Sequence, residues 1–307
     1  MELRALGSSD LRVSIVGLGC NNFGGRIDID AARKVIDRAI DRGINHFDTA
    51  DVYGGGGKSE TIIGELLGPR RERIVLATKF GKMSEAVPGI RGSRAYVPKA
   101  VEASLKRLRT DRIDLLYMHE PDPKTPIDET LGALDALQKA GKVRHIAASN
   151  FSSVELAAAE TAAKKLGVAG FVASQDEYSL LARGIERTLL PELIRERLAL
   201  VPYFPLGGGA LSGKYRKGHP LPTGRHGSGS DRFLAPHWDL IEKLYAFAGE
   251  RGHTLLELAM SWLAGKAGVA SIIAGATKPE QIDANVAAVG WKLTAAEMAA
   301  VDAMTAG

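Results

Sequence analysis

The sequence predicts an α/β protein, and within that class a parallel (β/α)8 barrel of the TIM type. Short β-branched runs alternate with amphipathic helical segments along the whole chain, and this alternation is typical of a parallel sheet. Eight such units in 307 residues give about 38 residues per unit, which suits a closed eight-stranded barrel. A doubly wound open sheet shows the same alternation and is the alternative.

The candidate strands are apolar runs bounded by turn residues. They cover residues 13–18, 44–48, 74–79, 113–119, 143–149, 171–175, 198–204 and 271–275. Helical patterns lie between them, and several end at a glycine that suits a C-terminal cap. The clearest of these patterns cover residues 31–43, 59–68, 97–109, 129–142 and 153–167. No linker interrupts the series, so a single domain over residues 1–307 is expected.

Two segments depart from the regular repeat. Residues 3–14 contain two strand-like pieces around a Gly-Ser-Ser-Asp turn, which predicts a β-hairpin that plugs one mouth of the barrel. Residues 207–231 form a long stretch rich in glycine, proline and serine after the seventh strand. Loops of that length are usually functional lids or disordered linkers, and a flexible surface excursion is the alternative to a ligand-binding loop here.

Composition narrows the class of protein. The 40 Lys and Arg exceed the 36 Asp and Glu by a net charge of +4, and they are scattered along the chain, which offers nucleic acid no basic stripe. Cys20 is the single cysteine, so no intrachain disulfide can form and a reducing compartment is favoured. The charged N-terminus does not look like a secretory signal, and no apolar stretch is long enough to span a membrane. We expect a cytoplasmic protein.

Polar side chains gather where the predicted strands end. Asp48, Lys79 and His119 end the second, third and fourth strands, and Tyr53 follows the second strand by a few residues. In parallel barrels these ends meet at one rim, where the chemistry of such barrels is found. Each residue alone is more often structural than catalytic, but burying all four together is costly unless they satisfy one another.

The four residues suit the protonation of an alkoxide as it forms. A tyrosine is a weak acid at neutral pH, and we expect the Lys79 ammonium to lower the pKa of Tyr53. Asp48 keeps that lysine charged, and His119 donates a hydrogen bond to a carbonyl oxygen. An alternative use of Lys79 is Schiff-base formation in an aldolase, against which the nearby carboxylate of Asp48 argues.

The chain resembles the aldo-keto reductases in eight blocks, in order and over essentially its whole length. These blocks are GLGCNNFGG, GINHFDTADVYG, LATKFG, DLLYMHEPD, IAASNFS, SQDEYSLL, PYFPLGGGALSGKY and GATKPEQIDANV. The resemblance implies a nicotinamide-dependent carbonyl reductase on a (β/α)8 barrel. It assigns Tyr53 as the proton donor, Asp48 and Lys79 as its supporting pair, and His119 as the residue that orients the substrate carbonyl.

The resemblance also implies where the cofactor binds. It places the nicotinamide carboxamide against Ser149, Asn150 and Gln175, with the ring on Tyr203. Side chains of these types offer the donors, acceptors and aromatic plane that such a group needs. The glycine-rich segment after the seventh strand is expected to wrap the pyrophosphate with its backbone N–H groups. The cofactor-binding residues expected from this segment are Phe204, Leu206, Gly208, Leu211 and Lys214.

The adenine end departs from the pattern of relatives that use NADP. Asn285 matches the usual Asn there, but Ala284 stands in place of a Glu, and Gln281 and Gly275 stand where others carry Arg and Lys. Lys278 is the main remaining cation, and NADPH is the expected cofactor, bound by Gly275, Lys278, Gln281 and Asn285. A second departure is Asp176, where an Asn usually follows Gln175.

The substrate is expected to be a small carbonyl compound or alcohol, held by Asn21, Phe23, Val52 and Glu120. Its identity is not encoded in any motif, and no partner protein is indicated. A non-catalytic alternative is a cofactor-binding regulatory subunit, because the potassium-channel β subunits resemble the same family. The glycines 54–57 and the buried-looking Cys20 and His46 are interpreted as structural. The histidines lack metal-ligand spacing, so no metal site is predicted.

Overall fold

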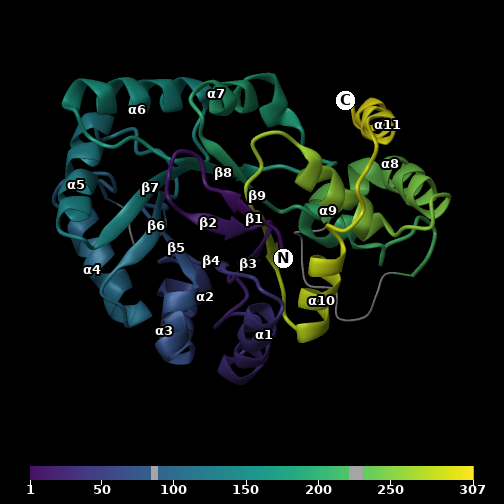
Figure 1. Cartoon of the computed structure of the whole chain (residues 1–307), viewed down its shortest axis with the longest axis horizontal. Helices are drawn as coiled ribbons and strands as arrows, with labels where there is room; N and C mark the ends of the chain where they lie inside the picture. Colours follow the sequence, from purple (N-terminus) through teal and green to yellow (C-terminus); the bar gives the residue numbers. More distant parts are fainter. Residues whose placement is uncertain (84–88, 221–230, 307) are drawn as a thin grey trace.

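The structure is a computed structural model that describes residues 1–83, 89–220 and 231–306. Within these residues, eight parallel strands form one sheet in the order β10-β3-β4-β5-β6-β7-β8-β9. Figure 1 shows these strands at the centre with helices around them. The strands are β3 (Val16–Gly19), β4 (His46–Asp48), β5 (Val75–Phe80), β6 (Ile113–Met118), β7 (Val143–Ser149), β8 (Ala173–Glu177), β9 (Ala199–Tyr203) and β10 (Ile272–Gly275).

The sheet closes on itself between its first and last strands. Leu200 of β9 donates its N–H to Gly268 O at 2.8 Å, and Ala270 donates to Leu200 O at 2.9 Å. These bonds join β9 to the segment that leads into β10. Closure leaves no free edge, so the predicted (β/α)8 barrel is confirmed and the open doubly wound sheet is excluded.

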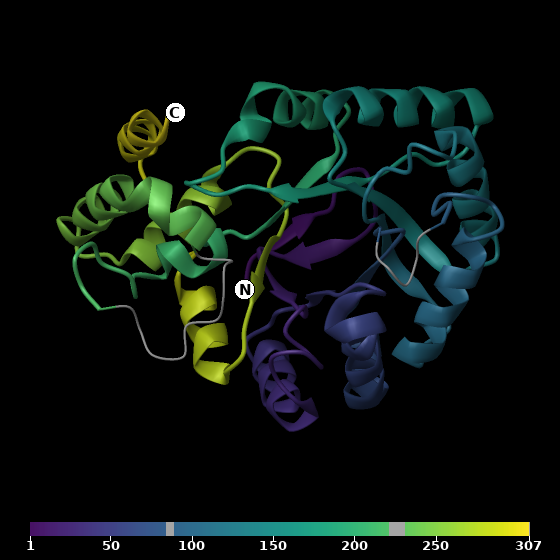
Figure 2. The same ribbon diagram turned by 180° about the vertical axis from the view of Figure 1, so that it is seen from behind.

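The N-terminal hairpin is also confirmed, with strands β1 (Leu3–Ala5) and β2 (Arg12–Ser14) paired antiparallel. Its apolar residues Leu6, Leu11 and Val13 pack inside the barrel against side chains that include Leu115 and Val201. The hairpin therefore covers one mouth of the barrel, as Figure 1 shows, and Figure 2 gives the view from the opposite side.

The first predicted strand, residues 13–18, was wrong as one unit. Val13 and Ser14 belong to the hairpin, whereas the barrel strand begins at Val16. The chain bends at Ile15. Ser14 holds this corner, because its N–H donates to the Asn45 side chain at 2.7 Å and its hydroxyl donates to Val16 O at 2.7 Å. An apolar run continues through this corner, so periodicity alone could not locate it.

The helices cover the outside of the barrel, and the barrel strands that they connect are parallel, as predicted. Their N-termini carry strong local signals: Ser152, Thr254 and Thr294 each form a reciprocal capping box with the glutamate three residues later, which satisfies two free backbone N–H groups. The helices are α1 (Ile29–Asp41), α2 (Tyr53–Gly56), α3 (Lys58–Leu67), α4 (Val97–Leu108), α5 (Ile127–Lys139), α6 (Ser153–Leu166), α7 (Leu189–Arg195), α8 (Asp231–Gly249), α9 (Leu255–Gly265), α10 (Pro279–Ala287) and α11 (Ala295–Thr305).

The long segment predicted after the seventh strand lies only in part within the described residues. Its first residues form a 3-10 helix, η3 (Gly207–Ser212), and residues 221–230 with His226 lie outside the described residues. Two further 3-10 helices are η1 (Gly68–Arg73) and η2 (Gly184–Arg187). Arg216 ties the segment to α8 through Glu242 at 2.8 Å and through the ring of Tyr245 at 3.8 Å.

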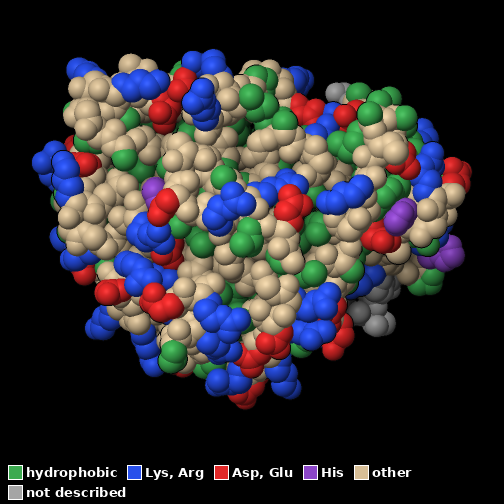
Figure 3. All heavy atoms as spheres, in the orientation of Figure 1, with side chains coloured by type: hydrophobic (Ala, Val, Ile, Leu, Met, Phe, Trp, Pro, Cys, Tyr) green, Lys and Arg blue, Asp and Glu red, His purple; other side chains and the backbone are tan. Residues whose placement is uncertain are grey.

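Basic and acidic side chains are interspersed on the face that carries the hairpin, as Figure 3 shows. Many of them form ion pairs, such as Arg144 with Asp10 at 2.9 Å. In the part of the chain that the structure describes, no helix is long and apolar enough to cross a membrane.

Candidate active site

The four residues singled out for catalysis lie together at the carboxyl ends of β4, β5 and β6. Asp48 ends β4, Lys79 is the last residue but one of β5, and His119 directly follows β6. Tyr53 begins the single turn α2, five residues beyond Asp48. Because neighbouring parallel strands end at the same edge of the barrel, the sequence could predict this grouping.

Lys79 is the centre of the cluster and is only 1% exposed. Its Nζ lies 2.6 Å from Asp48 Oδ2, 2.9 Å from the carbonyl oxygen of Thr49 and 3.3 Å from Tyr53 Oη. All three donor positions of the ammonium are therefore occupied. A buried charge is tolerated only when it is paired and hydrogen-bonded in this way.

The electrostatics of Lys79 follow from this geometry. Burial acts to lower the pKa of Lys79, but the charge of Asp48, the Tyr53 hydroxyl and the hydrogen bonds to both outweigh it and raise that pKa. The lysine is therefore an ammonium at neutral pH. An aldolase needs a lysine with a lowered pKa, so this geometry disfavours the Schiff-base alternative.

The expected lowering of the Tyr53 pKa is wrong in its net direction. Burial raises the pKa of Tyr53, and the opposing effect of the Lys79 ammonium is smaller. Asp48 adds to the increase, because a nearby negative charge disfavours the phenolate. The phenol is consequently protonated over the physiological pH range, and Lys79 acts by limiting the cost of its ionisation.

His119 lies beside Tyr53, with ring centroids 5.9 Å apart in an edge-on arrangement. Burial lowers the pKa of His119 to about 2, and the charges of Lys79 and Lys82 add to the decrease. The imidazole is thus neutral at all working pH values. Its backbone N–H donates to Phe80 O at 2.8 Å, and its Nδ1 is buried without a partner among the described residues. A neutral imidazole can donate one N–H to a carbonyl oxygen.

The loop that carries Tyr53 owes its path to glycine. Gly54, Gly55, Gly56 and Gly57 all have φ between 71° and 90°, a region that other residues rarely adopt. A Cβ on Gly57 would lie 2.4 Å from Arg107 Nε. These glycines therefore place Tyr53 over Lys79, in agreement with their structural interpretation.

Buried polar contacts anchor the helix that follows this loop. Ser59 donates to Cys20 O at 2.8 Å and its oxygen lies 2.8 Å from Thr49 Oγ1. The fully buried Glu60 accepts from Thr78 Oγ1 at 2.5 Å and from Arg107 Nε at 2.6 Å. These hydrogen bonds connect the start of α3 to the ends of β3, β4 and β5. They thereby fix the position of the preceding turn that carries Tyr53.

The residues predicted to hold the nicotinamide form one hydrogen-bonded network with the four residues predicted for catalysis. Gln175 donates from Nε2 to Asp48 Oδ1 at 2.8 Å, and Ser149 donates to Gln175 O at 2.8 Å. Asn150 donates from Nδ2 to His119 O at 3.0 Å and to Ser149 Oγ at 3.0 Å. The Tyr203 hydroxyl donates to Asn150 Oδ1 at 2.7 Å. This mixture of amide, hydroxyl and half-buried aromatic groups fits a nicotinamide.

The residues after β9 divide into two groups. Phe204 is 43% exposed and has a left-handed φ of 52°, Gly208 and Lys214 are exposed, and Leu206 is half-buried. These positions are open to a ligand. Leu211 is fully buried in the hydrophobic core, so its side chain does not face a cofactor, contrary to the prediction. The 3-10 helix η3 directs the Leu211 side chain into the core. The glycine-rich sequence did not predict this helix.

The adenine-end residues lie at the end of β10 and the start of α10. Gly275 is exposed, and a Cβ there would lie 3.1 Å from Asn22 Nδ2 and 3.4 Å from Asn21 Oδ1. Lys278 is exposed at the N-cap of α10. Gln281 accepts from the Thr277 N–H at 2.7 Å, so its oxygen holds the segment that leads into the helix. Asn285 is buried, with 5% of its surface exposed.

One further cation, Arg26, lies near this end and was not predicted from the sequence. Arg26 Nη1 donates to Asn22 Oδ1 at 3.4 Å, and Asn22 Nδ2 donates to Ala276 O at 3.4 Å. Arg26 precedes α1, which runs beside α10 and is paired with it through Arg38 and Asp283 at 2.8 Å. The tertiary fold therefore brings Arg26 toward the start of α10. No spacing rule in the sequence connects positions about 250 residues apart.

Of the predicted substrate residues, some are accessible to a ligand and one is buried in the core. Asn21 is exposed and Val52 is half-buried. Glu120 lies next to His119, with Lys82 Nζ at 3.6 Å and Arg91 Nη1 at 3.5 Å. Phe23 is 0% exposed and packs in the large hydrophobic core, so its side chain lines no open surface, contrary to expectation. For a phenylalanine that follows a strand, the sequence does not distinguish a side chain in the hydrophobic core from one that lines a pocket.

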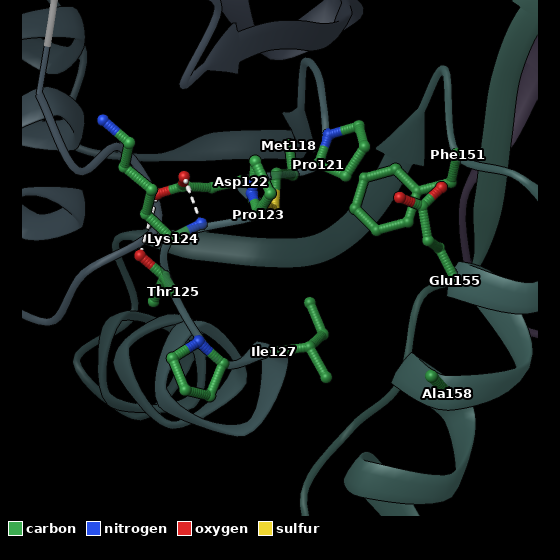
Figure 4. Close-up of a pocket in the computed structure, with 11 residues that line it drawn as sticks. Met118, Pro121, Asp122, Pro123, Lys124, Thr125, Ile127, Phe151, Glu155 and Ala158 are labelled. Atoms are coloured by element: carbon green, nitrogen blue, oxygen red, sulfur yellow. Dashed lines mark hydrogen bonds between the residues drawn. The ribbon is translucent and has the colours of Figure 1, made fainter.

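A separate hollow of about 420 Å³ lies outside the barrel. Figure 4 shows Phe151 and Glu155 on one side of it and Pro121 and Ile127 on the other. It is bounded by the loop after β6 and the first turns of α5 and α6, and none of the four residues predicted for catalysis lines it. It is therefore distinct from the candidate active site.

The remaining singled-out residues have structural surroundings. Cys20 is fully buried, and burial raises the pKa of its thiol. His46 Nδ1 lies 2.9 Å from Ser271 Oγ inside the barrel. Among the described residues, no three His, Cys, Asp or Glu side chains form a metal-binding group.

Comparison with known proteins places this site in a family. Residues 15–306 match the model of the Aldo/keto reductase family. The chain is 35% identical over 302 residues to a "Probable voltage-gated potassium channel subunit beta" of Arabidopsis thaliana and 37% identical over 300 residues to an "Uncharacterized oxidoreductase YrpG" of Bacillus subtilis. A rice protein, also named "Probable voltage-gated potassium channel subunit beta", is 34% identical. Each alignment covers 94% of this chain and 91% of the relative. With a barrel, a site and a family model that agree over nearly its whole length, this chain belongs to the aldo/keto reductase family.

Proposed function

We propose that this protein is an NADPH-dependent oxidoreductase that reduces aldehydes or ketones to alcohols and catalyses the reverse reaction. The observation that carries the proposal is the position of Lys79, whose Nζ joins Asp48 at 2.6 Å to Tyr53 at 3.3 Å. A buried ammonium beside a phenol serves to stabilise the phenolate that remains after proton transfer. The family membership supports the same class of reaction.

The proposed mechanism assigns one role to each residue. When it is bound, the reduced nicotinamide supplies a hydride from its C4 atom to the carbonyl carbon. His119, neutral because its pKa is about 2, donates an N–H to the carbonyl oxygen and orients it. Tyr53 then gives its phenolic proton to that oxygen, and Lys79 stabilises the tyrosinate. Asp48 keeps Lys79 charged.

The proposed cofactor site adds Arg26 to the predicted set and leaves out the buried Leu211. Ser149, Asn150 and Gln175 hold the carboxamide, and Tyr203 lies against the ring. The open positions after β9, namely Phe204, Leu206, Gly208 and Lys214, cover the pyrophosphate. Gly275, Gln281 and Asn285 bound the adenosine, and Lys278 with Arg26 supplies positive charge for a 2'-phosphate. The N-cap position of Lys278 supports this, because helix starts attract anions.

A direct test is to assay aromatic, aliphatic and sugar carbonyls with NADPH and with NADH. Turnover with a clear preference for NADPH is the expected result. Turnover with NADH alone would overturn the NADPH assignment, and failure with every carbonyl and both cofactors would overturn the proposed reductase activity.

We also propose that Asn21, Val52 and Glu120 contact the substrate, and that the protein acts in the cytoplasm on a small molecule.

A regulatory role is the second candidate, because two relatives are named as channel β subunits. In that case the protein would bind NADPH without turning over substrate at a useful rate. The two functions differ in the effect of Tyr53→Phe on single-turnover oxidation of bound NADPH by an added aldehyde. A large loss of rate supports the reductase, whereas equally slow oxidation in both proteins supports the regulatory role.

A further inference from the structure

Glu120 follows His119 at the mouth of the barrel, and three donors from the segment between β5 and α4 surround its carboxylate. Lys82 Nζ lies 3.6 Å from Oε1, and Arg91 Nη1 lies 3.5 Å from Oε2. The Met83 N–H donates to Oε2 at 3.4 Å. Close charge-assisted hydrogen bonds to a carboxylate are about 2.7–2.9 Å long. The three donors therefore converge on this carboxylate without holding it tightly.

Arg91 is the fixed member of this group of donors, with 6% of its surface exposed. Its Nη1 donates to Gly81 O at 2.8 Å, and its backbone N–H donates to Asp122 Oδ2 at 2.7 Å. These bonds tie it to the segments that leave β5 and β6. Among residues 1–83, 89–220 and 231–306, Glu120 is the one acidic side chain within ion-pair distance of its guanidinium. A buried cation is stable only when it is paired and hydrogen-bonded, so this position favours an anion.

Lys82 and Glu120 are the two members that reach solvent. The Lys82 side chain is 44% exposed, and that of Glu120 is 31% exposed. Two cations therefore face one carboxylate in the part of the chain that the structure describes. Because Glu120 already reaches water, its carboxylate can turn outward without being buried elsewhere, and the donors then become available to a second anion.

The strand register places these donors one position beyond the imidazole that is proposed to orient the substrate carbonyl. Phe80 of β5 pairs with Met118 of β6, and the His119 N–H donates to Phe80 O at 2.8 Å. Lys82 and Glu120 continue the two segments beyond this bond and meet at 3.6 Å. The donors therefore lie beside a substrate whose carbonyl oxygen binds His119.

We propose that Lys82, Arg91 and the Met83 N–H bind a carboxylate of the substrate in place of Glu120, so that the preferred substrates are aldehydes or ketones with an acidic group. The proposal rests on the proposed function, because it requires His119 to bind the substrate carbonyl. A planar guanidinium matches the geometry of a carboxylate, and the Lys82 ammonium adds a positive charge. Glu120 then borders the substrate and competes with it for the same donors.

The test compares kcat/KM for two acidic aldehydes and for their uncharged methyl esters, at one ionic strength and with saturating cofactor. One pair is 4-carboxybenzaldehyde with its methyl ester, and the other is 3-carboxybenzaldehyde with its methyl ester. The two acids place the carboxylate at different distances from the aldehyde. A hydrogen bond to a charged group corresponds to a change of roughly tenfold or more, so at least one acid should be preferred over its ester by about tenfold.

Two variants should change this acid-to-ester ratio in opposite directions. Lys82→Met removes the exposed cation, so the ratio should fall by about tenfold, while kcat/KM for the ester stays nearly the same. Glu120→Gln removes the competing carboxylate but keeps a side chain of similar size, so kcat/KM for the acid should rise by about threefold to tenfold. Loss of a merely structural contact would instead lower the values for acid and ester alike.

Lys124→Met is the matched control for Lys82→Met. Lys124 is exposed on the loop after β6, and its replacement changes the net charge of the protein by the same amount. General attraction of anions to a positively charged protein depends on that net charge. The acid-to-ester ratio of Lys124→Met should therefore match that of the wild type.

The acid-to-ester ratios separate this inference from the proposed function. An acid preference that Lys82→Met abolishes and Glu120→Gln increases supports the acidic substrate class. Equal turnover of acid and ester in both pairs, slower turnover of the acid by Glu120→Gln, or an equal loss of preference in Lys82→Met and Lys124→Met would each overturn it. A protein that reduces other carbonyls but none of these aldehydes would refute only the acidic substrate class, whereas one that reduces no carbonyl with either cofactor would refute the proposed function as well.

Discussion

Replacing Lys79 with methionine removes the ammonium that joins Asp48 to Tyr53 but keeps a side chain of similar length. Lys79 is 1% exposed, and Asp48 is 2% exposed. The variant therefore leaves a buried carboxylate with Gln175 Nε2, at 2.8 Å, as its remaining hydrogen-bonding side chain among the described residues. Breaking a buried ion pair in this way costs about 3–5 kcal/mol.

The loss is measurable as a change in Tm and in the free energy of unfolding. At roughly 2 °C per kcal/mol for a chain of this size, Tm should fall by about 6–10 °C. The double variant Asp48→Asn/Lys79→Met removes both charges and should recover most of that loss. Lys139→Met is the control, because Lys139 is 73% exposed and pairs with Asp135 one helical turn away. Such surface pairs contribute about 0.3–0.5 kcal/mol.

The same variant tests the electrostatic role of Lys79 in the reaction. Without the ammonium, the pKa of Tyr53 should rise further, because Lys79 is the main group that opposes the effect of burial. The alkaline decline of kcat for carbonyl reduction should then move to higher pH while kcat itself falls. A Lys79→Met protein as stable as Lys139→Met, or an active one with an unchanged alkaline limb, would refute this reasoning.

Three further outcomes follow from the structure. Tyr53→Phe should lower kcat for carbonyl reduction by roughly 10² to 10⁴, the value of a general acid, with the Kd of NADPH nearly unchanged; a variant that keeps a tenth of wild-type kcat would contradict the assignment. Lys278→Ala should weaken NADPH binding by about ten- to a hundredfold, since a hydrogen bond to a charged group contributes roughly 1.5–3 kcal/mol, and Arg26→Met should act in the same direction. Fluorescence titration should show little change for NADH, and equal losses for the two cofactors would mean a structural effect. Burial lowers the pKa of His46 to about 4, so its contribution to stability is complete above pH 6.5 and is lost as pH falls toward 4. Unfolding of His46→Gln should depend less on pH in that window, and an unchanged slope would count against it.

Much of the fold and the catalytic cluster could be predicted from sequence, because both depend on regular patterns. Alternating strands and helices require a parallel sheet, and eight of them close into a barrel. The same geometry brings the strand ends together, so Asp48, Lys79 and His119 could be placed at one rim. Each helix start that carries a Ser or Thr followed three residues later by Glu could also be recognised locally.

The parts that failed depend on which atoms surround a residue. The run 13–18 keeps its apolar character through a corner that only the contacts of Ser14 define. Phe23 and Leu211 have types that suit either a pocket or a core, and the packing of distant helices placed both inside. Arg26 approaches the start of α10 through Asn22 and Ala276, a contact that no local pattern contains.

The sequence by itself determined the order of elements, the closed barrel and the identity of the groups at its rim, because these follow from periodicity and from the direction of parallel strands. Only the tertiary structure decided the electrostatic state of those groups. Burial raises the pKa of Tyr53 against the effect of Lys79 and gives Asp176 a pKa of about 6. Desolvation depends on every atom packed around a group, and those atoms come from segments far apart in the chain.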